Sequence, residues 1–151
     1  LRMRTSIYNI ETRIGTNGKP YIMEVSPRGG GNRLAEMLRM ATGVDMVTAS
    51  VRAALGESVT DIVQRPYDGH WAEVILHADR CGTFRGLDIS PEMSRHVVER
   101  DLWVREGAQV SSFNGANDAI GTLVMKFESC VESEQFLQNQ QSSINLRIIR
   151  Q

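Results

Sequence analysis

The sequence predicts an α+β protein in which a strand hairpin and two helices precede a small, mainly antiparallel β-subdomain. Three observations support this class. Apolar and polar residues alternate over residues 6–14, apolar residues follow a helical spacing over 33–55, and short apolar runs separated by turn residues follow residue 70. The length of 151 residues suits one domain or two small lobes.

The first two predicted strands form a hairpin. Alternation over 6–14 and strand-like residues over 19–25 surround the turn residues Gly15–Gly18, which include an Asn-Gly pair. This pair is a strong hairpin signal between alternating segments. Glu11 and Glu24 are therefore expected on two adjacent antiparallel strands.

A glycine-rich loop and two helices are expected next. Pro27 stops the second strand, and Gly29–Gly31 permit unusual backbone angles and the close approach of a ligand. Asn32 is expected to begin a helix that ends near Gly43. Asp45 is expected to cap a second helix, which ends at Gly56. The residues expected to face the core from the second helix are Met46, Val47, Val51, Ala54 and Leu55.

The second half is expected to be a small sheet with one late helix. The predicted strands span 71–77, 83–89, 96–104, 120–127 and 144–149, and the predicted helix spans 129–143. Trp71 and Trp103 are expected to anchor the core of this half, because large aromatic side chains dominate core burial.

Composition excludes several classes of protein. Seventeen Lys and Arg residues against eighteen Asp and Glu residues give a net charge of −1, which disfavours general nucleic-acid binding. No apolar run approaches the ~20 residues of a membrane span, and no secretory signal opens the chain. Cys81 and Cys130 form no CxxC motif, so two reduced thiols in a cytoplasmic protein are expected.

The hairpin and the following loop bring together groups that suit metal and phosphate chemistry. Two carboxylates on neighbouring strands repel unless a cation lies between them, and Mg²⁺ accepts such oxygen ligands. Arg28 lies four residues past Glu24, where a guanidinium can meet a phosphate or acyl-phosphate oxygen. Backbone N–H groups of Gly29–Gly31 can line an anionic ligand. Spacing alone favours solvated surface glutamates over a metal pair, and a flexible turn over a ligand-binding glycine loop.

Other reactive residues carry weaker signals. The histidines have no metal-ligand spacing, so structural or surface roles are expected for His70, His77 and His96. Cys130 has no clear base partner, and Arg33 is expected with Glu36 on a solvated helix face.

The stretch N-I-E-T-R-I-G-T-N-G-K-P-Y-I-M-E-V-S-P-R-G-G-G resembles the metal-binding end of the ATP-grasp superfamily. That superfamily includes D-alanine–D-alanine ligase, biotin carboxylase, the large subunit of carbamoyl phosphate synthetase and amino-acid ligases. The resemblance implies ATP and Mg²⁺ as cofactors, with Mn²⁺ as an alternative ion. It implies that Glu11 and Glu24 bind metal and nucleotide, with Ser26 as a further metal ligand where the family has Asn. Arg28 is implied as the catalytic residue, and Gly29 and Gly30 as cofactor-binding residues.

The resemblance also implies a domain organisation. It is strong over 8–57 and looser after residue 71. Residues 1–60 correspond to the metal- and phosphate-binding part of an ATP-grasp domain, 61–69 to a linker, and 70–151 to a small C-terminal β-rich subdomain. Because the family's nucleotide-clamping lobe has no counterpart, the chain is expected to be the C-terminal portion of a longer ligase and to be inactive alone.

The implied reaction activates a carboxylate as an acyl phosphate, which an amine or similar nucleophile then attacks. The expected partners are ATP and a small carboxylate or amino-acid-like substrate, with a homodimer left open and neither nucleic acid nor membrane expected. Three alternatives remain: a bicarbonate-activating enzyme of the carbamoyl-phosphate-synthetase or biotin-carboxylase kind, a non-catalytic binding module that kept the fold, and a purely structural β-rich domain.

Overall fold

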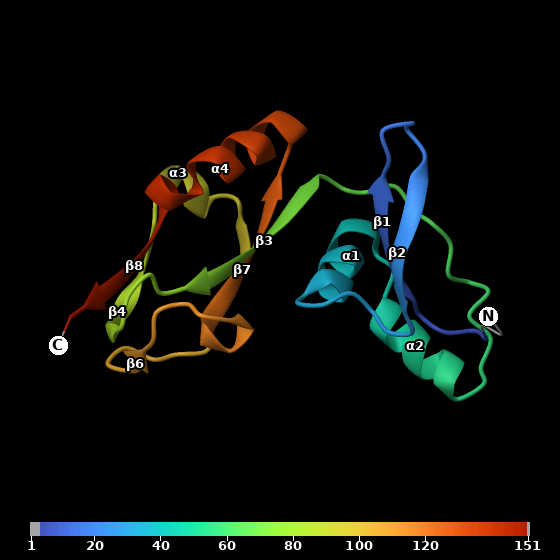
Figure 1. Cartoon of the computed structure of the whole chain (residues 1–151), viewed down its shortest axis with the longest axis horizontal. Helices are drawn as coiled ribbons and strands as arrows, with labels where there is room; N and C mark the ends of the chain where they lie inside the picture. The colour runs from blue at the N-terminus through green and yellow to red at the C-terminus, as the bar shows by residue number, and fades with distance from the viewer. Residues whose placement is uncertain (1–3, 151) are drawn as a thin grey trace. The chain divides into compact units, whose positions relative to one another are not determined.

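The computed structural model describes residues 4–150, apart from the side chains of residues 140 and 141. Contacts between Cα atoms divide the chain into two compact units, Leu1–Asp68 and Gly69–Gln151 (Figure 1). Each unit has its own secondary structure and is described separately below.

The first unit contains a two-stranded antiparallel sheet followed by two helices. Its elements are β1 (Asn9–Ile14), β2 (Pro20–Ser26), α1 (Leu34–Thr42) and α2 (Met46–Ala54). The Gly15 N–H donates to the carbonyl of Lys19 over 2.9 Å and closes the turn between the strands. The predicted hairpin and helix pair are thus present, with bounds that differ from the expected ones by a few residues.

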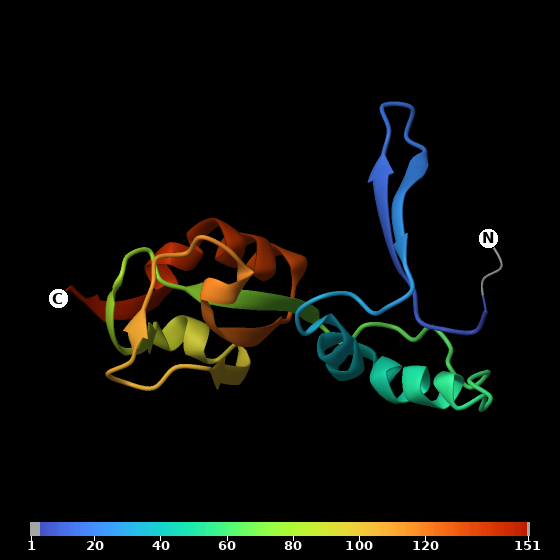
Figure 2. The same ribbon diagram turned by 60° about the horizontal axis from the view of Figure 1, so that its bottom comes forward.

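The hairpin stands away from the two helices of its own unit (Figure 2). Its apolar side chains are consequently exposed to solvent among the described residues: Ile10 keeps 50% of its accessible surface, Ile22 66% and Ile14 71%. An isolated two-stranded hairpin is marginally stable in water. The hairpin therefore gains little stability from packing within residues 4–150.

The helices are held by capping and by a returning loop. The Asp45 side chain accepts a hydrogen bond from the Thr48 N–H over 2.9 Å, which confirms the predicted cap of α2. Arg52 near the end of α2 pairs with Asp61 (Nη1 to Oδ2, 2.9 Å) and holds the loop that follows.

The expected burial of α2 is wrong at four of the five expected core residues, since only Met46 is partly buried. Val47, Val51 and Leu55 keep 57%, 56% and 71% of their surface exposed, whereas Ala49 is buried at 7%. The helix carries apolar residues on more than one side, and the side that is covered is the one with small residues, where chain segments approach closely. Beneath it lies a cavity of about 100 Å³, lined among others by Ile7, Met46, Ala49, Ala53, Val59 and Ile62.

The start of α1 also differs from the prediction. The helix begins at Leu34 with Arg33 as its N-cap residue, and no side chain caps it. Asn32 lies outside the helix in the left-handed region, with φ of 53°. Asn32 therefore belongs to the loop and is not part of the first helical turn.

The second unit contains two three-stranded antiparallel sheets. The strand orders are β3-β7-β5 and β6-β4-β8. The elements are β3 (His70–His77), β4 (Gly82–Ile89), α3 (Pro91–Ser94), β5 (Val97–Leu102), β6 (Gln109–Val110), the 3₁₀ helix η1 (Ala116–Asp118), β7 (Ala119–Phe127), α4 (Cys130–Ser143) and β8 (Ile144–Ile149). The predicted strands and late helix are present, whereas α3, β6 and η1 were too short to give a periodic signal. No helix within residues 4–150 has both the length and the apolar character to cross a membrane.

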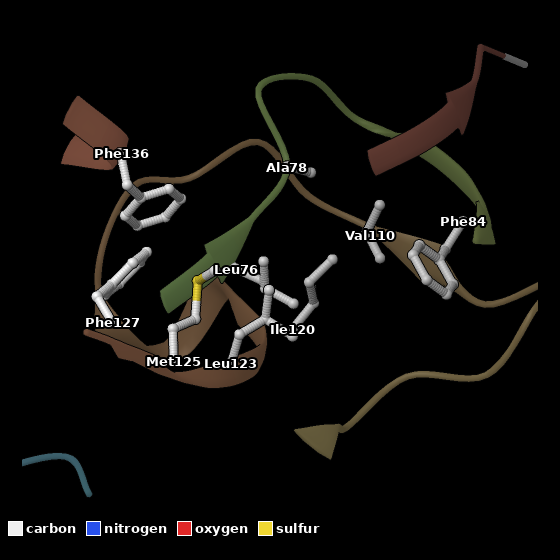
Figure 3. Packing of buried hydrophobic residues seen from close by; sticks show 9 residues of the cluster. All are labelled: Leu76, Ala78, Phe84, Val110, Ile120, Leu123, Met125, Phe127 and Phe136. Carbon is white, nitrogen blue, oxygen red and sulfur yellow. The ribbon is translucent and has the colours of Figure 1, made fainter. Parts of the chain in front are cut away.

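The core of this unit is built around β7 (Figure 3). Leu123, Val124 and Met125 in the middle strand of its sheet are 0% exposed. The ring of Phe127 stacks on Phe136 of α4 with centroids 5.3 Å apart, and His96 stacks near the same ring at 4.7 Å. This continuous burial explains why β7 reads as an almost unbroken apolar run.

The two tryptophans do not anchor this core as expected. Trp103 keeps 56% of its surface exposed, and its indole N–H donates to Asp101 Oδ2 over 2.9 Å. Trp71 is partly buried, with Lys126 Nζ 5.7 Å from the centroid of its ring. Phenylalanines and aliphatic residues fill the interior, because they bring no polar group that needs a partner.

Candidate functional site

The register of the hairpin places the two predicted carboxylates directly opposite each other. Glu11 on β1 pairs with Glu24 on β2, and Asn9 pairs with Ser26 two positions along. Alternate residues of a strand point to the same face. One face of the hairpin therefore presents four oxygen-bearing side chains, from Asn9, Glu11, Glu24 and Ser26.

Two like charges in this position need a partner. Directly opposed residues of an antiparallel pair have Cβ atoms about 4.5–5.5 Å apart, and like charges there are destabilising. The Ser26 hydroxyl donates a hydrogen bond to Glu24 Oε1. Within residues 4–150, the Glu11 carboxylate has neither a hydrogen-bond nor an ion-pair partner. The pair is thus a concentrated negative charge that a cation would neutralise.

A β-bulge follows the carboxylate pair. The register shifts between Glu11 and Thr12, so that Thr12 pairs with Ile22. Bulges are over-represented beside active sites, where they redirect side chains. Past the bulge the polar face continues with Arg13 opposite Tyr21. The other face carries Thr12 and the apolar residues Ile10, Ile14, Pro20, Ile22 and Val25. The face with Glu11 and Glu24 is therefore charged and polar, and the opposite face is mainly apolar.

Arg28 lies in the turn just beyond β2. Its backbone N–H donates to the Ser26 carbonyl over 2.9 Å, and its guanidinium Nη1 donates to the Gly29 carbonyl over 2.9 Å. The side chain is exposed and forms no ion pair with any residue between 4 and 150. Four of the five guanidinium N–H groups are therefore left for an anionic ligand.

The glycine loop does not use the unusual backbone angles expected of it. Gly29, Gly30 and Gly31 have no positive φ, and the left-handed residue of the loop is Asn32. Asn adopts this region more readily than other non-glycine residues. Gly30 is instead a position of close approach: a Cβ there would lie 2.3 Å from Leu34 Cδ2, so that side chain would have to rotate away, whereas a Cβ on Gly31 would meet open space.

Arg33 is also placed differently from the expectation. Its side chain is only 16% exposed, and its Nε forms an ion pair with Glu36 Oε2 on the next turn. The expected solvated face is therefore wrong at Arg33, whereas the Glu36 side chain keeps 49% of its surface. This ion pair anchors the start of α1 close to the glycine loop.

The donor set fits a hard divalent cation. Mg²⁺ takes oxygen ligands and is usually held by one or two carboxylates, with phosphate oxygens and waters completing six positions. Glu11 and Glu24 could supply the two carboxylates of such a site, and the Ser26 hydroxyl lies next to them. The described residues contain no group of three or more His, Cys, Asp or Glu side chains suited to a metal. A cation at this pair would therefore need neutral oxygens, water or phosphate as its remaining ligands.

His96 and Cys130 are two further reactive side chains, and both make contacts within the second unit. His96 is 9% exposed, and its Nδ1 lies 3.0 Å from the Lys126 carbonyl. The Cys130 thiol donates to Glu134 Oε1 over 3.3 Å, and this carboxylate raises the pKa of the thiol. A raised pKa keeps the group protonated and weakly nucleophilic at neutral pH.

Comparison with known proteins identifies the fold. No family model matches the sequence. An uncharacterized protein y4rH of Sinorhizobium fredii is 29% identical over 143 residues, covering 93% of this chain and 29% of that protein. Among solved structures, L-amino acid ligase from Bacillus licheniformis gives a TM-score of 0.70 at 24% identity over 94% of this chain. Phosphoribosylglycinamide synthetase from Anaerococcus prevotii gives 0.69 at 21% identity over 94%. Biotin carboxylase from Campylobacter jejuni gives 0.66 at 16% over 93%.

These solved structures are ATP-grasp enzymes. The chain has an ATP-grasp-like fold. The α+β class predicted from the sequence is therefore confirmed. The chain spans 29% of the curated relative and 35%, 37% and 32% of the three solved structures, so the likeness concerns one part of each of them.

Asn9 lies on the polar face beside Glu11, and the sequence analysis assigned it no functional role. Its position follows from simple counting, because Asn9 and Glu11 are two residues apart on an alternating strand. The signal was available once the hairpin register was known.

Proposed function

We propose that this chain carries the metal- and phosphate-binding part of an ATP- and Mg²⁺-dependent ligase. The observation that supports it most is the direct opposition of Glu11 and Glu24 on the polar face of the hairpin, with Arg28 in the next turn. The likeness to ATP-grasp enzymes and the limited share of their length that the chain spans support a part of a longer enzyme.

The two glutamates have the role of holding the cation. Glu11 and Glu24 bind Mg²⁺, or Mn²⁺ in its place, and Ser26 orients Glu24 through its hydrogen bond and adds its own oxygen. A divalent ion held by these residues would supply positive charge to offset the negative charge that accumulates during phosphoryl transfer.

The loop after β2 has the role of binding the transferred group. Arg28 donates to the oxygens of the acyl phosphate and to the negative charge that forms during nucleophilic attack. Backbone N–H groups of Gly29 and Gly30 add further donors. In this reaction a carboxylate oxygen attacks the γ-phosphorus and ADP leaves. An amine then attacks the carbonyl carbon, loses a proton and displaces inorganic phosphate.

A bicarbonate-activating reaction is the second candidate. It is favoured by the similarity to the biotin carboxylase domain of Hydrogenobacter thermophilus 2-oxoglutarate carboxylase, solved with MgADP and bicarbonate, at a TM-score of 0.64. The amino acid ligase has a higher TM-score and identity, so ligation to an amine ranks first. ADP release by the longer enzyme separates the two: amine ligation requires a carboxylate and an amine, whereas the alternative requires bicarbonate.

The metal site is tested by titrating Mn²⁺ into the 151-residue chain and measuring free Mn²⁺ by electron paramagnetic resonance. We expect Glu24→Gln to weaken binding roughly tenfold or more, because it removes a charged ligand. Glu106→Gln makes the same chemical change at an exposed turn of the second unit and leaves binding unaltered. Equal affinity in the Glu24→Gln variant and the unmodified chain would remove the basis of the proposed function.

A further inference from the structure

We infer that Asn114, in the loop between β6 and β7, is a site of spontaneous deamidation, whereas Asn17 in the hairpin turn is protected from it. The sequence contains two Asn-Gly pairs, Asn17-Gly18 and Asn114-Gly115. An asparagine that precedes glycine is particularly reactive, because glycine has no Cβ to hinder attack by its own backbone nitrogen. This modification needs neither metal nor ATP, so it is independent of the proposed function.

The reaction takes place across the peptide bond that follows the asparagine. The backbone nitrogen of the glycine gives up its proton to water or hydroxide and attacks the asparagine Cγ, forming a carbon–nitrogen bond. The bond between Cγ and Nδ2 then breaks, and Nδ2 takes up a proton and leaves as ammonia. Water adds to one of the two carbonyl carbons of the resulting succinimide ring and opens it to aspartate or isoaspartate. The glycine N–H and the asparagine side-chain amide must therefore both be free to approach each other.

In the hairpin turn, these groups are all engaged in hydrogen bonds. The Gly18 N–H donates to the Gly15 carbonyl over 2.9 Å. Asn17 Nδ2 donates to the Tyr21 hydroxyl over 2.9 Å, and Asn17 Oδ1 accepts from the Lys19 N–H over 3.0 Å. Ring formation breaks these hydrogen bonds, so the folded turn opposes it.

In the loop before β7, the corresponding groups are free. Among residues 4–150, neither the Asn114 side chain nor the Gly115 N–H has a hydrogen-bond partner. The Asn114 N–H donates to Asp118 Oδ2 over 2.9 Å, and the Asp118 N–H donates to the Gly115 carbonyl over 2.9 Å, so the loop is held on either side of the reacting amide. Asn17 and Asn114 are both exposed. Hydrogen bonding therefore distinguishes the two pairs, and access to water does not.

The modified loop would differ from the unmodified one in charge and in length. Either product places a negative charge four residues before Asp118, whose carboxylate accepts the hydrogen bond from residue 114. Isoaspartate also adds one methylene to the main chain beside Phe113, whose ring lies against His77 with centroids 4.5 Å apart.

Gly115 offers a variant that slows the reaction without straining the backbone. Its φ of 178° is extended, and a Cβ added there would meet open space. A methyl group on this residue hinders the attack of its nitrogen on Asn114 Cγ, so we expect Gly115→Ala to slow deamidation of Asn114 roughly tenfold. Gly18 offers no such variant, because its φ of 73° favours glycine.

The test incubates the 151-residue chain at mildly alkaline pH and follows both Asn-Gly peptides by mass spectrometry, which detects the replacement of the amide NH₂ by OH. We expect product at Asn114 to form at least roughly ten times faster than product at Asn17. In urea, where the chain is unfolded, the two pairs should react at similar rates, because neither keeps its folded contacts. Circular dichroism verifies that Gly115→Ala is folded.

Slow reaction at Asn17 and suppression of the Asn114 product by Gly115→Ala would support the inference. Two results would overturn it. If Asn114 stays unmodified in the folded chain while both pairs react in urea, the loop holds the Gly115 nitrogen away from Asn114 Cγ. If the folded chain is modified at Asn17 as fast as at Asn114, the hydrogen bonds of the hairpin turn do not select between the two pairs.

Discussion

Strand β7 and the β1–β2 hairpin are both antiparallel, but they are stabilised in opposite ways. Three consecutive residues of β7, Leu123, Val124 and Met125, have no exposed surface, whereas Ile14 and Ile22 of the hairpin keep 71% and 66% of theirs. Burial of a side chain of this size is worth about 1.5–3 kcal/mol. The second unit therefore has a core that supports its own sheets, and the hairpin does not.

The hairpin instead concentrates polar chemistry. Its strands place Glu11 opposite Glu24, and two like charges in this arrangement cost stability when no cation lies between them. A ligand that binds only the ordered state stabilises that state in proportion to its concentration and affinity. The two regions therefore differ in the source of their stability. The second unit is stabilised by its core, whereas the hairpin would be stabilised by a cation bound between Glu11 and Glu24.

The largest effect is expected from truncating the core of the second unit. Phe127 is 1% exposed and its ring stacks on Phe136, so Phe127→Ala should lower the free energy of unfolding by about 3–5 kcal/mol. Urea unfolding followed by circular dichroism measures the change. Ile14→Ala in the hairpin is the matched truncation and should alter the free energy by no more than about 0.5 kcal/mol. Similar losses of unfolding free energy at the two positions would show that the hairpin and the second unit do not differ in packing.

A smaller effect is expected in the loop that joins the hairpin to α1. Gly30→Ala should cost about 1 kcal/mol, because its Cβ would overlap Leu34 Cδ2 unless that side chain rotates away. Gly31→Ala is the matched control and should be close to neutral, since its Cβ meets open space. Thermal unfolding of both variants measures the difference. A neutral Gly30→Ala would mean that this part of the first unit is as loosely packed as the hairpin.

The smallest effect is a pH dependence at α2. The pKa of Asp45 lies below its ordinary value because the Thr48 N–H and hydroxyl donate hydrogen bonds to the carboxylate. The folded state therefore binds the proton less readily than the unfolded state. This contribution to stability is present above the ordinary carboxyl pKa of about 4 and is lost as the pH falls through the lower folded pKa.

Asp45→Asn tests this contribution, because an asparagine still caps the helix but does not titrate. We expect the unfolding temperature to fall less between pH 5 and pH 2 in the variant than in the unmodified chain, with the residual loss including Asp61, whose pKa is lowered by Arg52. Identical pH profiles would show that the ionisation of Asp45 contributes nothing to the stability of the first unit.

Local patterns predicted most of the secondary structure. The Asn-Gly turn between alternating segments predicted β1 and β2, and Asp45 predicted the start of α2. Local patterns were poor guides to burial. Val51 has the spacing of a core residue but is exposed, and Trp103 has the size of one but lies at the surface. Which side of an element is covered depends on segments distant in sequence, which periodicity does not encode.

The sequence by itself determined the elements, the α+β class and the proximity of Glu11 and Glu24, because alternation and turn chemistry act between near neighbours along the chain. Only the tertiary structure decided the register that places Glu11 opposite Glu24 and Asn9 opposite Ser26, and the close approach at Gly30. The physical reason is that a shift of one residue in a hairpin would turn every side chain to the other face. The residues of the candidate site can be read from the sequence, whereas their placement side by side depends on how the strands pair.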